Sequence, residues 1–228
     1  MRILHLYPEL MNLYGEYGNV LVLKKHLEDQ GLEVTIDRKD VEESIDFDRY
    51  DMIYMGSGTE KNQLIALKDL LKYKYYFKKA VDDGKVILFT GNAMELLGKN
   101  IDDQPGLDIV DFTVEITDKR YTGDVIVNNE KTSEVVGFIN KSSLIKGGEK
   151  EKLFTYEFKH STLVDNDYEG YRIKNLFGTH IIGPVLVKNP GFMEVIVRLL
   201  VKEGYQKITY PLEEDAYKTT LEELRKRK

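Results

Sequence analysis

Short apolar runs alternate with segments of helical periodicity over about the first 100 residues of the chain. Helices are predicted over 19–30, capped by Asn19, and over 62–83, because leucines recur at helical spacing and Gly31 and Gly84 follow as stop signals. Strands are predicted at four apolar runs, Ile3–Tyr7, Val34–Ile36, Asp51–Met55 and Val86–Phe89, and the first and fourth are expected to be buried. This order of elements is typical of a mostly parallel sheet with helices on both faces.

After Pro105 the pattern changes to β-prone runs that are separated by polar turns. These runs predict an antiparallel extension of the sheet at Asp108–Ile116, Tyr121–Asn128, Glu134–Ile139 and Leu153–Phe158. A further strand is predicted over Tyr171–Phe177, a helix from Asn189-Pro190 to Gly204, and a surface helix over Leu212–Lys228. The predicted fold class is α/β, with residues 1–228 forming one domain.

The fourth apolar run leads into a corner of small residues, after which Ala93–Leu97 is predicted to begin a helix. A strand that bends sharply into a helix at small residues has the geometry of a nucleophile elbow. In such an elbow the corner side chain is exposed beside the free amides of the helix N-terminus. Gly91 and Asn92 occupy the corner here, and the chain contains no cysteine. The sequence therefore predicts the frame of a nucleophile without the nucleophile.

The charge and the amino-acid composition of the chain exclude several classes of function. The net charge of −6 argues against a nucleic-acid partner, which requires a basic face. The lack of cysteine excludes disulfides, thiolate catalysis and cysteine-based metal sites. The segment from Met1 to Tyr7 is predicted to be a strand rather than a signal peptide, and no apolar run approaches the ~20 residues that span a bilayer. A cytoplasmic protein without a cofactor or metal is expected.

Several residues outside the corner are candidates for chemistry, and each has a plainer alternative. Gly56-Ser57-Gly58 either presents backbone N–H groups to an anion or forms a tight turn. Arg120 either clamps a carboxylate with its planar guanidinium or lies exposed in a turn. Thr90 and Ser57 are hydroxyls near the corner, and a hydroxyl nucleophile needs an adjacent base, for which His180 is the one candidate.

The four histidines are scattered, and none has the spacing of a metal-ligand set. His5 falls in a predicted buried strand and is expected to be a core residue with satisfied hydrogen bonds. His26 on a helix face and His160 in a loop are expected to be solvated. His180, at the end of a strand, is the histidine for which a chemical role is considered.

Several segments match the pattern of one protein family. Gly56–Gln63 is similar to its Gly-Gly-Gly-Gln-Asp-x-x-Gln loop, and Arg120–Gly123 to its Arg-x-x-Gly, whose arginine is associated with substrate glutamine. Tyr7–Asn19, Gly137–Asn140 and Gly178–Pro190 match three further signatures. Together they resemble the class I glutamine amidotransferases of the cobyric acid synthase type, and most closely the GatD-type glutaminase subunits of lipid II isoglutaminyl synthase. The resemblance covers nearly the whole chain and implies a Rossmann-like three-layer fold.

The chain departs from this family at both catalytic positions. The family elbow reads Cys-Gly-Gly-Tyr-Gln-Leu-Leu-Gly, and alignment on Leu96-Leu97-Gly98 puts Gly91 at the cysteine. Alignment on Gly183-Pro184 puts Ile182 at the catalytic histidine. The same alignments put Asn92 on a glycine and Glu95 on the glutamine. The family's Asn-His-Gly-Gly segment is replaced by residues 140–143, Asn-Lys-Ser-Ser.

The departures have a chemical consequence. The family hydrolyses glutamine through a thioester formed by a thiolate that an imidazole activates, and glycine and isoleucine supply neither group. Loss of one member of such a unit typically costs several orders of magnitude in rate. The leading hypothesis is therefore a catalytically degenerate subunit that serves as partner or regulator of a MurT-like Mur ligase, the family's companion, in peptidoglycan (lipid II) amidation.

Two alternatives remain open. In the first, the chain is an active amidotransferase in which Thr90 acts as the nucleophile and His180 as the base. Because Thr90 precedes the corner, however, its side chain is expected to point into packing. In the second, the chain is a sensor that binds glutamine or another amino acid without converting it. The candidate substrate-binding residues are Gly56, Ser57, Gly58, Asn92 and Arg120.

Overall fold

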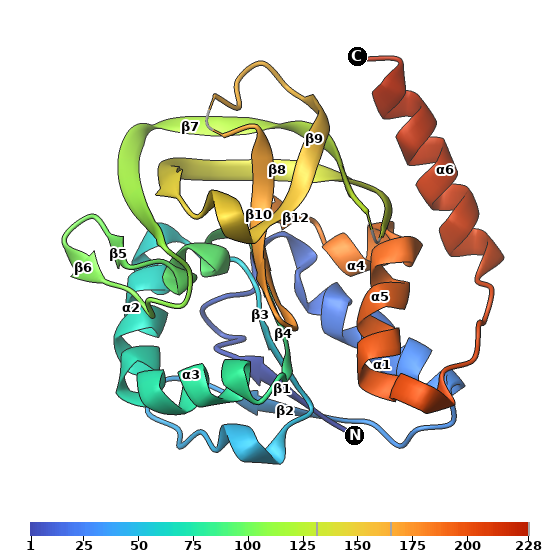
Figure 1. The fold of residues 1–228 in the computed structure, drawn as a ribbon, viewed down its shortest axis with the longest axis horizontal. Coiled ribbons are helices and arrows are strands. Elements are labelled where there is room, and N and C mark those ends of the chain that lie inside the picture. Colours follow the sequence, from blue (N-terminus) through green and yellow to red (C-terminus); the bar gives the residue numbers. More distant parts are fainter. Residues whose placement is uncertain (131, 165, 228) are drawn as a thin grey trace.

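A twelve-stranded mixed sheet runs through the computed structural model, which describes residues 1–130, 132–164 and 166–227. The strand order is β12-β8-β7-β9-β10-β11-β4-β3-β1-β2, and β5 and β6 lie off this path. Figure 1 shows the helices on both sides of the lower half of this sheet, with the long strands arching above it. The predicted α/β class, a parallel sheet with an antiparallel extension, is confirmed.

The parallel half of the sheet carries the corner at the end of β4, between its neighbours β11 and β3. It contains five parallel strands, β1 (Arg2–Leu6), β2 (Thr35–Lys39), β3 (Met52–Met55), β4 (Val86–Thr90) and β11 (Leu176–Thr179). Every residue of β3 and β4 is buried, because helices cover both faces of a parallel sheet. The four strands predicted in the first hundred residues are therefore present.

Alternate residues of the central strands supply two separate cores. Ile53, Met55, Ile87 and Phe89 pack under α2 (Glu60–Leu70) and α3 (Lys74–Asp82). Their neighbours along the strands, such as Tyr54 and Leu88, face α1 (Tyr17–Asp29) and α5 (Pro190–Val201). This sorting follows from the period of two along a strand. Figure 1 shows α2 and α3 on one side of the sheet and α1 and α5 on the other.

The two main strands of the antiparallel extension are longer than the sequence predicts, and short strands accompany them. The runs predicted at 108–116 and 121–128 belong to one strand, whose register shifts between Ile116 and Tyr121. The strand predicted over 171–177 is in fact a hairpin that turns at Lys174, where φ is +52°. The strands are β5 (Asn100–Ile101), β6 (Gln104–Pro105), β7 (Phe112–Asn129), β8 (Thr132–Gly147), β9 (Lys152–Lys159), β10 (Tyr168–Ile173) and β12 (Ile181–Ile182).

Two helix predictions need correction. The helix predicted over 62–83 is interrupted by a 3-10 turn at Leu71–Tyr73, which divides it into α2 and α3. The segment Ala93–Leu97 belongs to a 3-10 helix, Gly91–Leu97, rather than to an α-helix. Gly31 and Gly84 have φ of +81° and +75° and end their helices as predicted. Further 3-10 turns lie at Leu13–Gly15, Phe47–Arg49, Glu149–Glu151 and Lys202–Gly204.

Two asparagines predicted as helix caps hold tertiary contacts instead. Asn19 lies inside α1, where its Oδ1 accepts the N–H of Leu186 at 2.8 Å and its Nδ2 donates to Tyr54 at 2.9 Å. The Asn189 side chain binds both the N–H and the C=O of Val136, at 2.7 and 2.9 Å. The prediction of Pro190 at the first helical position is correct. In both cases a buried partner outcompetes the local cap.

The C-terminal part forms α4 (Val185–Lys188) and α6 (Pro211–Arg225). Leu221 and Leu224 of α6 pack on Ile126 and Val136 of the extension, so this predicted surface helix covers the outer side of β7 and β8. Lys228, the predicted end of the helix, lies outside the described residues. Among the described helices, none has the length and apolar character that crossing a membrane requires.

Candidate functional site

The corner after β4 leaves no room for a side chain at Gly91. This residue has φ of +60°, a left-handed conformation that glycine adopts readily. A Cβ atom built on Gly91 would lie closer to Cβ and Oγ of Ser57 than real Cβ atoms approach other atoms, and 3.0 Å from Cγ2 of Ile182. The space that a side chain at Gly91 would need is therefore filled by Ser57 and Ile182.

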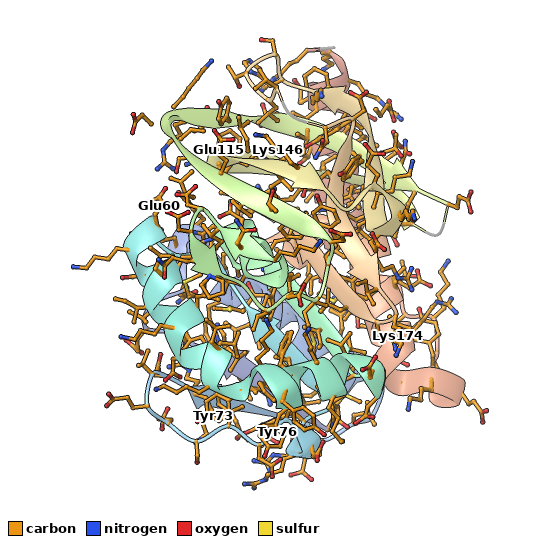
Figure 2. All side chains as sticks on the ribbon, turned by 60° about the vertical axis from the view of Figure 1, so that its left-hand side comes forward. Glu60, Tyr73, Tyr76, Glu115, Lys146 and Lys174 are labelled. Atoms are coloured by element: carbon orange, nitrogen blue, oxygen red, sulfur yellow. The ribbon has the colours of Figure 1, made fainter. Side chains whose placement is uncertain are left out.

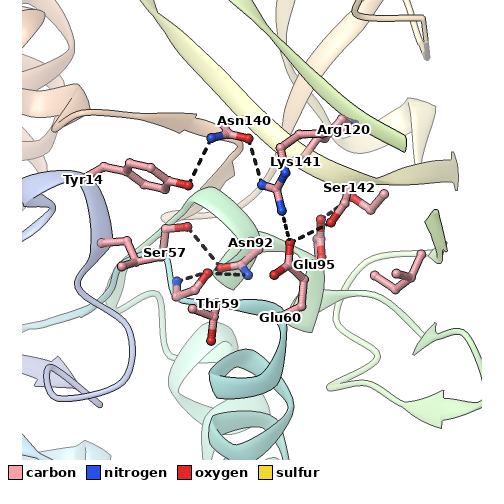
Figure 3. Close-up of a pocket in the computed structure, with 14 residues that line it drawn as sticks. Tyr14, Ser57, Thr59, Glu60, Asn92, Glu95, Arg120, Asn140, Lys141 and Ser142 are labelled. Atoms are coloured by element: carbon pink, nitrogen blue, oxygen red, sulfur yellow. Dashed lines mark hydrogen bonds and ion pairs between the residues drawn. The ribbon is translucent and has the colours of Figure 1, made fainter. Parts of the chain in front are cut away.

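The side chain of Asn92 closes the other half of the corner. Its Oδ1 accepts the backbone N–H of Gly58 at 2.9 Å and the hydroxyl of Ser57 at 3.2 Å, and its Nδ2 donates to the carbonyl of Gly58 at 3.0 Å. Figure 3 shows these bonds across the turn between β3 and α2. The predicted backbone donor of the 56–58 turn thus already has an acceptor within the chain.

Gly56 contributes packing rather than a donor to the site. A Cβ atom at this position would lie 2.7 Å from the carbonyl oxygen of Met11 and 2.9 Å from Cβ of Glu16. The glycine therefore allows the long loop after β1 to lie directly against the turn after β3. This close approach brings Leu13 and Tyr14 to the rim of the pocket described next.

A cavity of about 300 Å³ lies between this turn and the antiparallel extension. Ser57, Gly58 and Asn92 line one side, and Arg120 with residues 140–143 lines the other. The structure therefore brings together four of the five predicted substrate-binding residues. Figure 3 shows that the charged and amide groups on both sides point toward one another and are joined by hydrogen bonds.

Arg120 is paired within the chain. Its Nη2 donates to Oε1 of Glu60 at 2.8 Å, and its Nη1 donates to Oδ1 of Asn140 at 2.9 Å. The hydroxyl of Ser142 donates to the same Glu60 oxygen at 2.7 Å. These bonds, with Ser142 contributing most, outweigh partial burial and hold the pKa of Glu60 below its usual range. Arg120 therefore binds the chain's own carboxylate through a single N–H rather than as a two-bond clamp. Its side chain is 48% exposed, as in the plainer alternative, although it lies in β7 rather than in a turn.

His180 lies beneath the cavity between two buried carboxylates. Its Nε2 is 3.3 Å from Oε1 of Glu95, and its Nδ1 is 3.7 Å from Oε2 of Glu169; all three side chains are almost fully buried. Glu95 also accepts hydrogen bonds from Ser143 and, at 2.6 Å, from Gln63. Each acceptor of Glu95 is thus engaged, which makes it a structural anchor rather than a base.

The charges in this network stabilise one another. Burial and the nearby ammonium of Lys141 disfavour a charged ring, but the hydrogen bonds to Glu169 and Glu95 outweigh both and raise the pKa of His180. Burial likewise opposes ionisation of the two carboxyls, and the same ring lowers the pKa of each. The hydrogen bonds among these side chains therefore favour a charged ring and ionised carboxyls, against the opposing effect of burial.

Thr90 faces away from the cavity, as expected for the residue before the corner. Its hydroxyl is hydrogen-bonded to Glu16 and, at 3.1 Å, to Tyr54. Glu16 is fully buried in the loop after β1 and also accepts the N–H of Gly183 at 2.8 Å. Burial raises the pKa of Glu16 despite these hydrogen bonds. The burial of Glu16 could not be predicted from the sequence, because an acidic residue in a polar loop is usually exposed.

The other histidines differ from expectation in two of three cases. His5 is buried as predicted, but its ring nitrogens have no hydrogen-bond partner among the described residues, and burial lowers its pKa to about 4. His26 is 6% exposed rather than solvated, and its Nε2 lies 3.0 Å from Glu213 of α6. His160 is exposed as expected. Within the described ranges, no group of three or more acids and histidines is arranged to hold a metal ion.

Comparisons with known proteins agree with this architecture. A model of the CobB/CobQ-like glutamine amidotransferase domain matches residues 2–190. The chain is 30% identical over 198 residues to the GatD subunit of lipid II isoglutaminyl synthase (glutamine-hydrolyzing) from Staphylococcus aureus, covering 83% of this chain and 79% of that protein. It is 30% identical over 224 residues to the subunit of the same name from Streptococcus pneumoniae, covering 94% and 86%.

Among solved structures, the crystal structure of a glutamine amidotransferase superposes with a TM-score of 0.59 at 16% sequence identity. The match covers 86% of this chain and 98% of that chain. At this level of identity the likeness concerns the fold alone.

Proposed function

The chain belongs to the family of CobB/CobQ-like glutamine amidotransferase domains, and from this premise we propose that it is a GatD-type subunit without glutaminase activity. It acts as the partner or regulatory subunit of a MurT-like Mur ligase in the amidation of peptidoglycan precursors in the cytoplasm. Two relatives that are each matched over most of their length carry the GatD name, which supports this assignment. The sheet common to both halves of the chain supports a single domain over residues 1–228.

The observation that carries the loss of activity is the geometry at Gly91. Glycine supplies no nucleophile, and Ser57 and Ile182 fill the space into which one would project. Amide hydrolysis in this family requires a thiolate and a neighbouring imidazole. Neither group is available at this corner. The subunit therefore contributes its binding surface to a complex, and it does not contribute glutamine hydrolysis.

An active amidotransferase that uses Thr90 and His180 is poorly supported by the contacts of these residues. The Thr90 hydroxyl is bonded to Glu16 and Tyr54, whereas the His180 ring lies between Glu95 and Glu169. A base must be within hydrogen-bond reach of the hydroxyl that it activates. The two side chains serve separate buried networks, so neither activates the other.

Reconstitution with a MurT-like ligase tests the proposal. The two chains are co-expressed and purified, and amidation of a lipid II-type substrate is measured with glutamine or with ammonium chloride as the nitrogen source. We expect the chains to co-purify and the complex to use ammonium but not glutamine. The Staphylococcus aureus GatD subunit with its own ligase is the positive control for glutamine. Glutamine-dependent amidation, or failure of the two chains to associate, contradicts the proposal.

A further inference from the structure

The pocket beside the corner has the size of a ligand site, yet the groups suited to holding a ligand already have partners in the chain. We infer that this pocket is self-liganded, with the carboxamide of Asn92 and the carboxylate of Glu60 occupying the places of an amino-acid ligand's amide and carboxylate. The chain therefore does not take up glutamine. This inference rests on the proposed function and extends it from lost catalysis to lost binding.

The first step concerns the carboxamide. At a strand–helix elbow, the backbone N–H groups of the corner and of a neighbouring loop face the place where a substrate carbonyl oxygen lies. The Gly58 N–H belongs to such a loop, and it donates to Oδ1 of Asn92 at 2.9 Å. Nδ2 of Asn92 returns a bond of 3.0 Å to the Gly58 carbonyl, and Ser57 adds a third. An incoming amide has to break all three bonds.

The second step concerns the carboxylate. The guanidinium of Arg120 presents a planar fork that matches a carboxylate. Its Nη2 is bonded to Glu60 at 2.8 Å, its Nη1 to Asn140 at 2.9 Å, and Ser142 donates to the same carboxylate at 2.7 Å. Glu60 stands in the first turn of α2, so it is tethered beside Arg120 at a high effective concentration. A free carboxylate therefore competes at a disadvantage.

Space and charge do not by themselves exclude a ligand. The cavity of about 300 Å³ is at the lower end of the range for small-molecule sites. The opposite charges of Arg120 and Glu60 cancel, so a zwitterionic amino acid is neither attracted nor repelled by this pair. What excludes an amino-acid ligand is that the hydrogen-bonding groups of the pocket already have partners in the chain. Removal of the two internal ligands should therefore expose a binding site.

Isothermal titration calorimetry of the full chain with L-glutamine tests this inference. The proteins are the wild type, Asn92→Gly, Glu60→Ala and the double variant. The matched control is Glu115→Ala, which removes an exposed carboxylate of β7 that pairs with Lys146 (Figure 2) and does not line the pocket. We expect no saturable heat for the wild type and the control at millimolar glutamine. The double variant should show saturable heat, with a Kd at least about tenfold below the highest glutamine concentration at which the wild type shows none.

Saturable binding of glutamine by the wild type overturns the inference, and so does a folded double variant that binds no better than the wild type. Thermal unfolding of each variant establishes that it is folded. If the double variant does not fold, the surface variant Glu60→Ala decides: it has to bind measurably more tightly than Glu115→Ala. Glutamate release is assayed on the same samples. Binding by the wild type without release sinks this inference alone, whereas release by the wild type sinks the proposed function.

Discussion

Replacement of Gly91 by cysteine restores the family's nucleophile at the corner and tests whether the corner has room for it. A residue with a side chain in the left-handed conformation, here φ of +60°, costs about 1–2 kcal/mol. The new Cβ also collides with the side chain of Ser57, and overpacking typically costs about 1–3 kcal/mol. We therefore expect Gly91→Cys to lower the free energy of unfolding by about 2–5 kcal/mol.

Because the new side chain at position 91 collides with Ser57, a substitution of Ser57 by glycine should compensate for it. Ser57→Gly alone loses the hydrogen bond to Asn92, worth about 0.5–1.5 kcal/mol, and should be mildly destabilising. In combination with Gly91→Cys it removes the obstructing atoms, so the double variant should regain the overpacking cost of about 1–3 kcal/mol. Urea denaturation of the wild type, both single variants and the double variant closes a double-mutant cycle. A Gly91→Cys protein as stable as the wild type, or additive effects in the double variant, refutes the reasoning.

Further predictions concern buried polar groups and are all measured by chemical denaturation. Glu95→Gln breaks the ion pair with His180 and should lower the free energy of unfolding by about 3–5 kcal/mol. Adding His180→Tyr removes the ring that has lost this partner and should recover most of that loss; additive effects of the two substitutions contradict this. Because the pKa of His180 is raised, its stabilisation is complete below pH 6.5 and lost as pH rises through the folded-state value, and a His180→Gln variant should lack this slope. Asn189→Ala should cost about 2–4 kcal/mol by orphaning the backbone of Val136, and a loss below 1 kcal/mol counts against it.

The parallel core could be read from the sequence, since its strands are apolar runs and its helices end at glycines with positive φ. The long strands of the extension could not. Thr117–Arg120 is polar, so the pattern separates two runs that the structure joins by a register shift between Ile116 and Tyr121. Tyr171–Phe177 reads as one strand because Lys174 and Asn175, which form the hairpin turn, carry no glycine or proline signal.

The residues of the candidate site could be predicted from the sequence, but the hydrogen bonds that they form with one another could not. The sequence places Ser57, Asn92 and Arg120 at one site through the family pattern. It does not reveal that Asn92 and Glu60 satisfy the groups opposite them, because a hydrogen-bonding partner across the pocket depends on tertiary approach rather than on spacing. Burial was equally hidden for His26, whose partner Glu213 lies far along the chain, on α6.

Several positions at which the sequence pattern differs from the family signature contact one another in the structure. Ser57 touches Asn92 and fills the space beside Gly91. Below the cavity, Glu95 bonds both Ser143 and His180. The polar groups of the corner and of the network around Glu95 therefore satisfy one another, which a stable buried polar network requires.

The most direct test of the account is the release of glutamate from L-glutamine by the purified chain in complex with its MurT-like partner, measured against the partner alone. The corner that lacks both thiolate and imidazole predicts no release above that control at saturating glutamine. Turnover that requires this chain, and that disappears when the chain is omitted, contradicts the central claim.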